Sequence, residues 1–336
     1  MRNVAEAIRR NALPFGEWIG ELKNRDVLRA DIIAGITVAL VLVPQSMAYA
    51  QLAGLPPYVG LYASFLPVII ASIWGSSRQL ATGPVAVVSL MTAAALGPLA
   101  GSGTEGYVVY AAMLAILVGV FQFSLGALRL GVLVDFLSHP VVVGFTNGAA
   151  IIIATSQLSK LFGVSVEKAT HHYETVWRVL VAASENTHLA TLIMGIAALA
   201  IMVLLKKYLP KIPNVLTAVA VTTVVAWMID FESVGGKVVG VIPEGLPAMK
   251  IPEFDFGVIV DLSVAAVFIS LIGFMEAISI AKAMASQTRQ RLDANQELIG
   301  QGLSNMAAGL FQAYPVSGSF SRSAVNFSAG AKTGFS

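Results

Sequence analysis

The chain contains no cysteine, which excludes disulfide bridges and thiolate metal sites. Only 12% of its 336 residues are charged, whereas soluble domains carry about 25%. Its four histidines lack other metal ligands at suitable spacing within the apolar stretches, and the clustered serines there have no nearby histidine or lysine base. The net charge of +2 gives no sign of a nucleic-acid partner. These absences predict a protein that is not an enzyme and holds no metal or organic cofactor.

What the chain has in abundance is apolar sequence, with 56% hydrophobic residues. No charged side chain occurs between Ile32 and Ser77, and one helix needs only about 20 apolar residues to cross a bilayer. That stretch therefore holds two spans. The N-terminal arginines are not followed by a compact apolar core with a cleavage site, so the first span is expected to act as its own insertion signal. The composition predicts an all-α polytopic membrane protein.

The apolar runs define an expected order of segments. Residues 1–29 mix charged and apolar side chains, which is typical of an amphipathic helix on the membrane surface. The first span is interrupted at Pro44, and a polar segment, 168–187, separates the fifth span from the sixth. The expected spans cover residues 30–53, 58–74, 107–128, 140–162, 188–205, 215–229, 262–285 and 296–311, and two half-helices cover 84–95 and the residues from 319 onward.

Two short segments suggest where the function resides: 82–87 (TGPVAV) and 317–323 (SGSFSRS). Each looks like an extended stretch followed by a helix start, with Pro84 at a favourable first-turn position in one and serine caps in the other. A helix that begins inside a membrane points free N–H groups and about half a positive charge into a dry interior, where an anion can bind. The alternative is an ordinary loop and a surface turn. Matched broken helices in two halves of a transporter favour a midplane binding site.

Glu276 and Arg322 are the charged candidates for this site. An acid in mid-bilayer costs about 3 kcal/mol on insertion scales, so Glu276 is expected to line a pathway or to carry a coupling proton. It is interpreted as the one acidic residue well inside a span; the alternative role is a helix-holding ion pair with a basic residue. Arg322 lies early in the second half-helix, where its charge adds to the field of the helix end. It either contacts the anion or extends towards the interface.

Uncharged polar side chains complete the candidate set. Ser319, Ser321 and Ser323 present hydroxyls at two-residue spacing, some as caps and others as possible ligands for the anion. Gln45 and Tyr49 share one face of the first span at i and i+4. Gln45 needs a polar neighbour in so apolar a span, while Tyr49 fits a pocket or the core equally well.

The placement of basic residues predicts the orientation. With the N-terminus in the cytoplasm, most lysines and arginines of the loops fall on the cytoplasmic side, as the positive-inside rule requires. The two half-helices then run in opposite directions, so that their N-termini face each other near the midplane. The expected location is the cell membrane.

The chain resembles the SulP (sulfate permease) family of anion transporters over nearly its whole length. The resemblance is carried by residues 57–67 (PYVGLYASFLP), 75–78 (GSSR), 83–91 (GPVAVVSLM), 295–302 (NQELIGQG), 321–323 (SRS) and 330–333 (GAKT). Gln79 departs from the family pattern, because many members have histidine there. The chain also ends within or just after the tenth segment, which suggests a fragment of a longer protein.

The resemblance implies a nucleobase-transporter-like fold of two inverted repeats of seven segments, of which about ten of the fourteen are present. The remaining four segments and a cytoplasmic STAS domain would follow. It implies a core domain, which moves as an elevator against the gate domain of a homodimer. The implied divisions are a cytoplasmic N-terminus (1–29), core segments 1–4 (30–128), gate segments 5–7 (129–229), an extracytoplasmic linker (230–257) and core segments 8–10 (258–336).

The resemblance also assigns the site. It implies substrate binding by Gln45, Tyr49, Val85, Ala86, Ser321 and Arg322, with Glu276 as the coupling residue. The predicted function is secondary active transport of a small anion (sulfate, bicarbonate or a dicarboxylate), by proton-coupled symport. Alternatives are an uncoupled channel or exchanger, sodium-coupled bicarbonate transport, and nucleobase transport within the same fold class.

Overall fold

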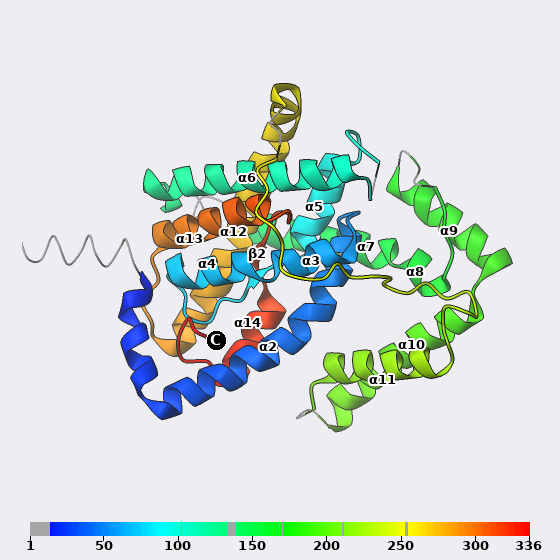
Figure 1. The fold of residues 1–336 in the computed structure, drawn as a ribbon, viewed down its shortest axis with the longest axis horizontal. Coiled ribbons are helices and arrows are strands. Elements are labelled where there is room, and N and C mark those ends of the chain that lie inside the picture. The colour runs from blue at the N-terminus through cyan, green and yellow to red at the C-terminus, as the bar shows by residue number, and fades with distance from the viewer. Residues whose placement is uncertain are drawn as a thin grey trace, which may run out of the picture. The chain divides into compact units, whose positions relative to one another are not determined.

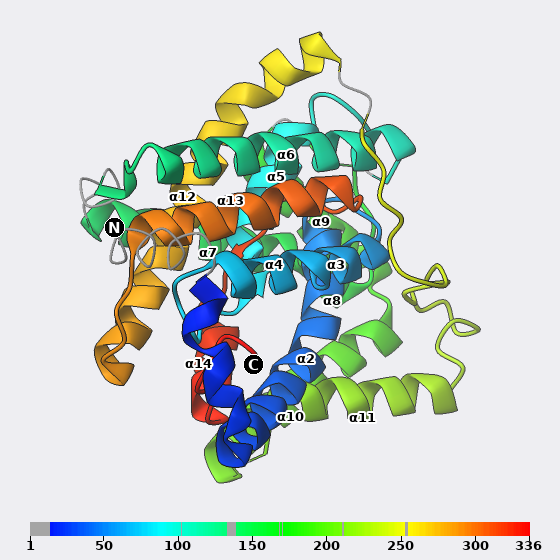
Figure 2. The same ribbon diagram turned by 60° about the vertical axis from the view of Figure 1, so that its left-hand side comes forward.

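The computed structural model describes residues 14–101, 103–132, 139–167, 169, 171–209, 212–252 and 255–336. The regular elements of these described residues are helices and one sheet of two very short strands, and Figures 1 and 2 show the ribbon from two directions. It divides into two compact units. One comprises Met1–Ser138 and Pro243–Ser336, and the other comprises His139–Ile242. The division into functional domains remains a prediction.

The first unit carries both candidate half-helices. Its elements are the 3₁₀ turns η1 (Pro14–Glu17) and η2 (Ile19–Lys23), the helices α2 (Arg25–Leu52), α3 (Pro57–Ala63), α4 (Leu66–Trp74), α5 (Ala86–Leu96), α6 (Glu105–Ala127), α12 (Phe256–Thr288), α13 (Ala294–Leu310) and α14 (Phe320–Ser328), and the strands β1 (Thr82–Gly83) and β2 (Ser317–Gly318). The expected surface helix at 1–29 lies partly outside the described residues. Its described part forms the two 3₁₀ turns and the start of α2.

In the described part of the second unit, the regular elements are all helices. They are α7 (His139–Ser156), α8 (Leu158–Phe162), α9 (His172–Asn186), α10 (Leu189–Tyr208) and α11 (Asn214–Met228). Helix α9 lies in the polar segment between the expected spans. Its side chains are mostly exposed, with Val179 as its buried residue, which explains why hydropathy alone gave no sign of it.

Five helical stretches in the described part are long and apolar enough to cross a membrane: Arg25–Leu52, Pro57–Trp74, Glu105–Ala127, Leu189–Tyr208 and Phe256–Thr288. Two shorter apolar helices, Ala86–Leu96 and Asn214–Met228, match the expected first half-helix and seventh span. The structure therefore agrees with a polytopic helical protein.

Three expected spans have different continuity in the structure. Helix α2 continues through Pro44, so the predicted interruption there is wrong. A proline inside a helix removes one N–H donor, and the surrounding turns of α2 retain helical geometry. Conversely, the second and fifth spans are each divided into two helices, α3 with α4 and α7 with α8.

Helix α13 lies between α6 and α4 (Figures 1 and 2). Glycines allow α6 and α13 to approach closely. A Cβ at Gly119 would lie 2.5 Å from the Met306 backbone nitrogen, and one at Gly302 would lie 2.5 Å from that of Phe123. A larger side chain at either position would force the backbones apart.

A buried carboxylate joins the start of the first span to the segment after α14. Asp31 in α2 is fully buried (0% exposed). Its Oδ1 accepts hydrogen bonds from the backbone nitrogens of Lys332 (2.7 Å) and Thr333 (3.2 Å), and its Oδ2 accepts one from the Thr333 hydroxyl (2.6 Å). Hydrogen bonds to a charged group are the stronger kind, so this contact holds the end of the described chain against α2.

Replacing Asp31 by alanine is expected to lower the stability of the protein by about 3 kcal/mol, because it leaves buried donors without an acceptor. Thermal unfolding of the purified protein measures the loss. Asp26→Ala in the same helix is the matched control, since Asp26 is exposed and surface changes usually stay within about 0.5 kcal/mol. Equal melting temperatures for the two variants would show that the contact contributes nothing.

Candidate anion site at two helix starts

Two strands pair where the half-helices begin. β1 and β2 are antiparallel, with Thr82 opposite Gly318 and Gly83 opposite Ser317. The pairing extends on one side, where the Ser319 nitrogen donates to the Ala81 carbonyl at 2.9 Å. Helices α5 and α14 start within three residues of their strands, so segments far apart in the sequence begin their helices beside each other. Both predicted helix starts are present in the structure, but Pro84 directly precedes the N-cap Val85 of α5, so its predicted place in the first turn is wrong.

The two helix starts differ in their caps. Val85 is the N-cap of α5, and its apolar side chain makes no cap hydrogen bond to the first turn of that helix. Helix α14 is capped by Ser319, whose Oγ accepts a hydrogen bond from the Arg322 backbone nitrogen at 3.4 Å. The first turn of α5 therefore keeps backbone N–H groups that can bind an anion.

Arg322 connects the two helix starts with α2. Its side chain is fully buried (0% exposed). Its Nη1 donates to the Pro84 carbonyl at 2.8 Å and to Gln45 Oε1 at 3.0 Å. Its Nε and Nη2 are buried without a hydrogen-bond partner in the described part of the chain. A guanidinium with unused donors in a buried setting is suited to an anionic ligand.

Gly83 makes this position of Arg322 possible. Its φ of 149° favours glycine, and a Cβ at this residue would lie 3.2 Å from Arg322 Nη2. Any side chain here would therefore strain the strand and crowd the guanidinium.

The other predicted site residues differ in how directly they are connected to Arg322. Gln45 also donates from Nε2 to the Tyr49 hydroxyl at 3.1 Å, which extends the hydrogen-bonded chain along α2. Val85 and Ala86 form the start of α5. Ser321 is exposed, and its Oγ lies 3.3 Å from Ser319 Oγ.

Glu276 lies in α12 within electrostatic range of Arg322 and Tyr49. Its Oε2 is buried and has no hydrogen-bond partner among the residues that the structure describes. Arg322 is the charged residue that acts electrostatically on this carboxyl. Whether Glu276 serves in coupling or in a helix-holding ion pair stays a prediction.

Several buried polar residues lie outside the set predicted from the sequence. Glu297 in α13 is 2% exposed and Asp31 in α2 is fully buried. Both lie at the start of their expected spans (296–311 and 30–53), so the interpretation of Glu276 as the one acid well inside a span stays a prediction. Tyr314 is fully buried, with its hydroxyl 3.1 Å from Ser89 Oγ and within electrostatic range of Arg322. The sequence signal for Glu297 was its place in the 295–302 motif. Tyr314 directly precedes the proline before the serine-rich segment 317–323.

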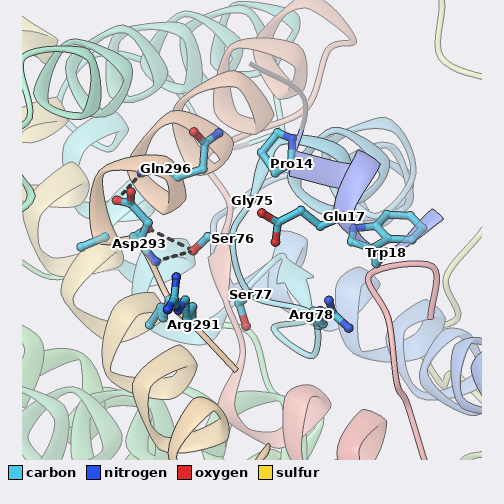
Figure 3. Close-up of a pocket in the computed structure, with 12 residues that line it drawn as sticks. Pro14, Glu17, Trp18, Gly75, Ser76, Ser77, Arg78, Arg291, Asp293 and Gln296 are labelled. Carbon is cyan, nitrogen blue, oxygen red and sulfur yellow. Dashed lines mark hydrogen bonds between the residues drawn. The ribbon is translucent and has the colours of Figure 1, made fainter. Parts of the chain in front are cut away.

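A separate cavity of about 710 Å³ lies at the loop before β1. In Figure 3, Ser76 and Ser77 lie between the N-terminal 3₁₀ turns, represented by Trp18, and the residues around Asp293 that lead into α13. Ser76 Oγ donates to the Asp293 carbonyl at 3.0 Å. None of the predicted site residues lines this cavity.

Metal ligands are not clustered in the part of the chain that the structure describes. The described residues contain no group of three or more His, Asp or Glu side chains placed to hold a metal ion. The polar groups at the helix starts are instead a cation, amides and hydroxyls, a set suited to an anion.

The arrangement is that of a helical membrane transporter with paired half-helices, and comparison with known structures supports this class. The chain aligns with the structure of SLC26A9 with a TM-score of 0.91 and 25% identity, covering 98% of this chain and 55% of that one. It aligns with the transmembrane domain of a cyanobacterial bicarbonate transporter, BicA, with a TM-score of 0.81 and 24% identity, covering 92% of this chain and 79% of that one.

The sulfate permease family model matches residues 28–336, and the chain belongs to that family, which confirms the resemblance. It is 40% identical over 332 residues to the chloroplastic sulfate transporter 4.1 of Arabidopsis thaliana, covering 96% of this chain and 48% of that protein. It is 38% identical over 310 residues to a probable sulfate transporter of Mycobacterium tuberculosis, covering 92% and 55%. The chain thus spans about half the length of these curated relatives. They are transporters, in agreement with the prediction that the protein is not an enzyme.

Proposed function

We propose that the protein transports a small anion, which binds between the N-termini of α5 and α14. The observation that carries the proposal is Arg322, a fully buried cation with two unused nitrogen donors beside both helix starts. Burying a charge is costly unless a partner compensates for it, and the field of the helix ends also favours a negative ligand. The names of the relatives, which include sulfate transporters, support the same class of substrate.

The finer mechanism is secondary active transport by an elevator motion, with Glu276 carrying a coupling proton. The buried Oε2 of Glu276, which has no hydrogen-bond partner among the described residues and lies within electrostatic range of Arg322, supports the coupling. Binding of the anion beside a charged Glu276 costs repulsion, which protonation of that carboxyl removes. Sodium is the alternative coupling ion, and uncoupled exchange or conduction is the alternative mode. A cell-membrane location, a cytoplasmic N-terminus and a homodimer belong to the same proposal.

Backbone amides and a guanidinium recognise negative charge with little regard for the group that bears it. Sulfate, bicarbonate and a dicarboxylate therefore remain candidates, and uptake into vesicles separates them. We expect purified protein in vesicles to take up labelled sulfate in a saturable manner. One or more of the unlabelled anions sulfate, bicarbonate and fumarate should compete with this uptake, and uracil should not. Competition by uracil alone would identify a nucleobase transporter, and uptake that does not saturate would indicate a channel.

A further inference from the structure

Helix α13 carries a row of buried polar side chains that the anion site itself does not use. Glu297, Gln301 and Asn305 are spaced by four residues, which places them on one face of the helix. All three are at least nine-tenths buried. Buried polar groups destabilise the fold unless they are hydrogen-bonded. The hydrogen-bond partners of these three side chains therefore show which segments they hold.

The first two members hold the segment that leads into α5. Glu297 Oε2 accepts hydrogen bonds from the backbone nitrogens of Ser76 (2.9 Å) and Ser77 (3.1 Å), in the loop before β1. Gln301 Nε2 donates to Glu297 Oε1 at 3.1 Å and to Thr82 Oγ1 at 2.8 Å. Because Thr82 is the first residue of β1, this chain of bonds fixes the strand to α13.

The third member holds the segment that leads into α14. Asn305 Oδ1 accepts a hydrogen bond from the Val316 nitrogen at 2.7 Å, and its Nδ2 donates to the Val316 carbonyl at 3.0 Å. The amide thus bonds to both backbone groups of one residue, as a neighbouring strand would. Asn305 Nδ2 also donates to Gln122 Oε1 at 3.0 Å, which ties the arrangement to α6.

The row therefore holds both strands from one rigid helix. Thr82 lies two residues before Pro84, whose carbonyl accepts the hydrogen bond from Arg322. Val316 directly precedes β2, which leads into the helix that carries Arg322. A movement of either strand relative to the other would change the distance between the helix start of α5 and the Arg322 guanidinium.

We propose that Glu297, Gln301 and Asn305 are positioning residues, which set the separation of the two half-helix N-termini and thereby the affinity for the anion. They do so without contacting the anion. The inference rests on the proposed anion site for its effect on affinity, whereas its effect on the strands can be measured without any ligand.

The inference is tested by removing the hydrogen bond between Gln301 and Thr82, with one variant at each of the two residues. Thr82→Val and Gln301→Met keep the approximate shape of each side chain and remove this bond, and Gln301→Met also removes the bond to Glu297 Oε1. Each is expected to weaken anion binding by about fivefold, the usual worth of one hydrogen bond. The double variant should bind no more weakly than the weaker single variant, because both changes remove the same interaction. Binding is measured by titration calorimetry with sulfate, bicarbonate and fumarate.

Ser304→Ala is the matched control. Ser304 lies on the same helix and is buried, but its hydroxyl donates to the Pro67 carbonyl at 2.7 Å, in the first turn of α4 rather than at either strand. This variant is expected to lose melting temperature like the others and to keep its anion affinity within about twofold of wild type. An equal loss of affinity in Ser304→Ala, or unchanged affinity in Thr82→Val and Gln301→Met, would overturn the inference.

Hydrogen exchange separates this inference from the proposed function. Exchange of the amides at residues 81–83 and 316–319 should be faster in Thr82→Val and Gln301→Met than in Ser304→Ala, because only the first two release a strand. If wild type binds none of the three anions, the proposed function fails, and the exchange result alone decides whether the row positions the strands. Equal exchange in all variants would refute the positioning role.

Discussion

Arg322→Gln is expected to abolish saturable anion uptake and to weaken anion binding by at least about 100-fold. A unit charge about 4 Å from an anion is worth about 4 kcal/mol at the effective dielectric constant typical of proteins, which exceeds the difference that a 100-fold change in affinity requires. The partial charges of the two helix ends remain, but no side chain replaces the two unused guanidinium donors. Binding of labelled anion to the purified variant measures the loss.

Two companion variants show whether charge or folding causes the effect. Arg322→Lys keeps the positive charge but lacks the additional donors that Nε and Nη2 offer to the anion, so an intermediate loss of affinity is expected. Arg78→Gln removes a cation from a partly exposed ion pair with Glu21 (2.9 Å) and should leave binding unchanged. A folded Arg322→Gln protein with wild-type affinity would remove the observation on which the proposed site depends.

The helix starts of this site were predictable because their signals are local. Gly83 with Pro84, and the serines at 317–323, act on the backbone within a few residues, and the structure places a helix start at each. The spacing of Gln45 and Tyr49 likewise predicted neighbours on one helix face, and the two side chains are hydrogen-bonded.

The long-range partners could not be predicted in the same way. Strands of two residues are too short to show an alternating pattern, so nothing in 82–83 or 317–318 indicates that they pair. Glu297 stands near the start of a helix, where an exposed acid is ordinary, and only the packing of α13 against the 76–77 loop shows that it is buried. Local patterns thus located the helix ends, whereas tertiary contacts determined which polar groups hold them.

Glu276→Gln is expected to eliminate accumulation of the anion driven by a proton gradient while exchange of labelled for unlabelled anion continues. Glutamine resembles the protonated carboxyl in shape and charge, so the variant should bind the anion but carry no proton. In the wild-type protein, affinity should fall as pH rises, by up to about tenfold per unit, the limit for one coupled proton. In the variant, affinity should be independent of pH.

Asp261→Asn is the matched control, because Asp261 is an exposed acid on the same helix α12 and should retain both accumulation and its pH dependence. The two coupling ions are separated by imposing either a proton or a sodium gradient across the vesicle membrane. Accumulation that follows sodium in wild type and is lost in Glu276→Gln would assign the same carboxylate to sodium coupling. If accumulation and its pH dependence survive unchanged in Glu276→Gln, the driving ion must bind elsewhere. The buried Oε2 of Glu276 in the wild-type protein would then have no role in coupling.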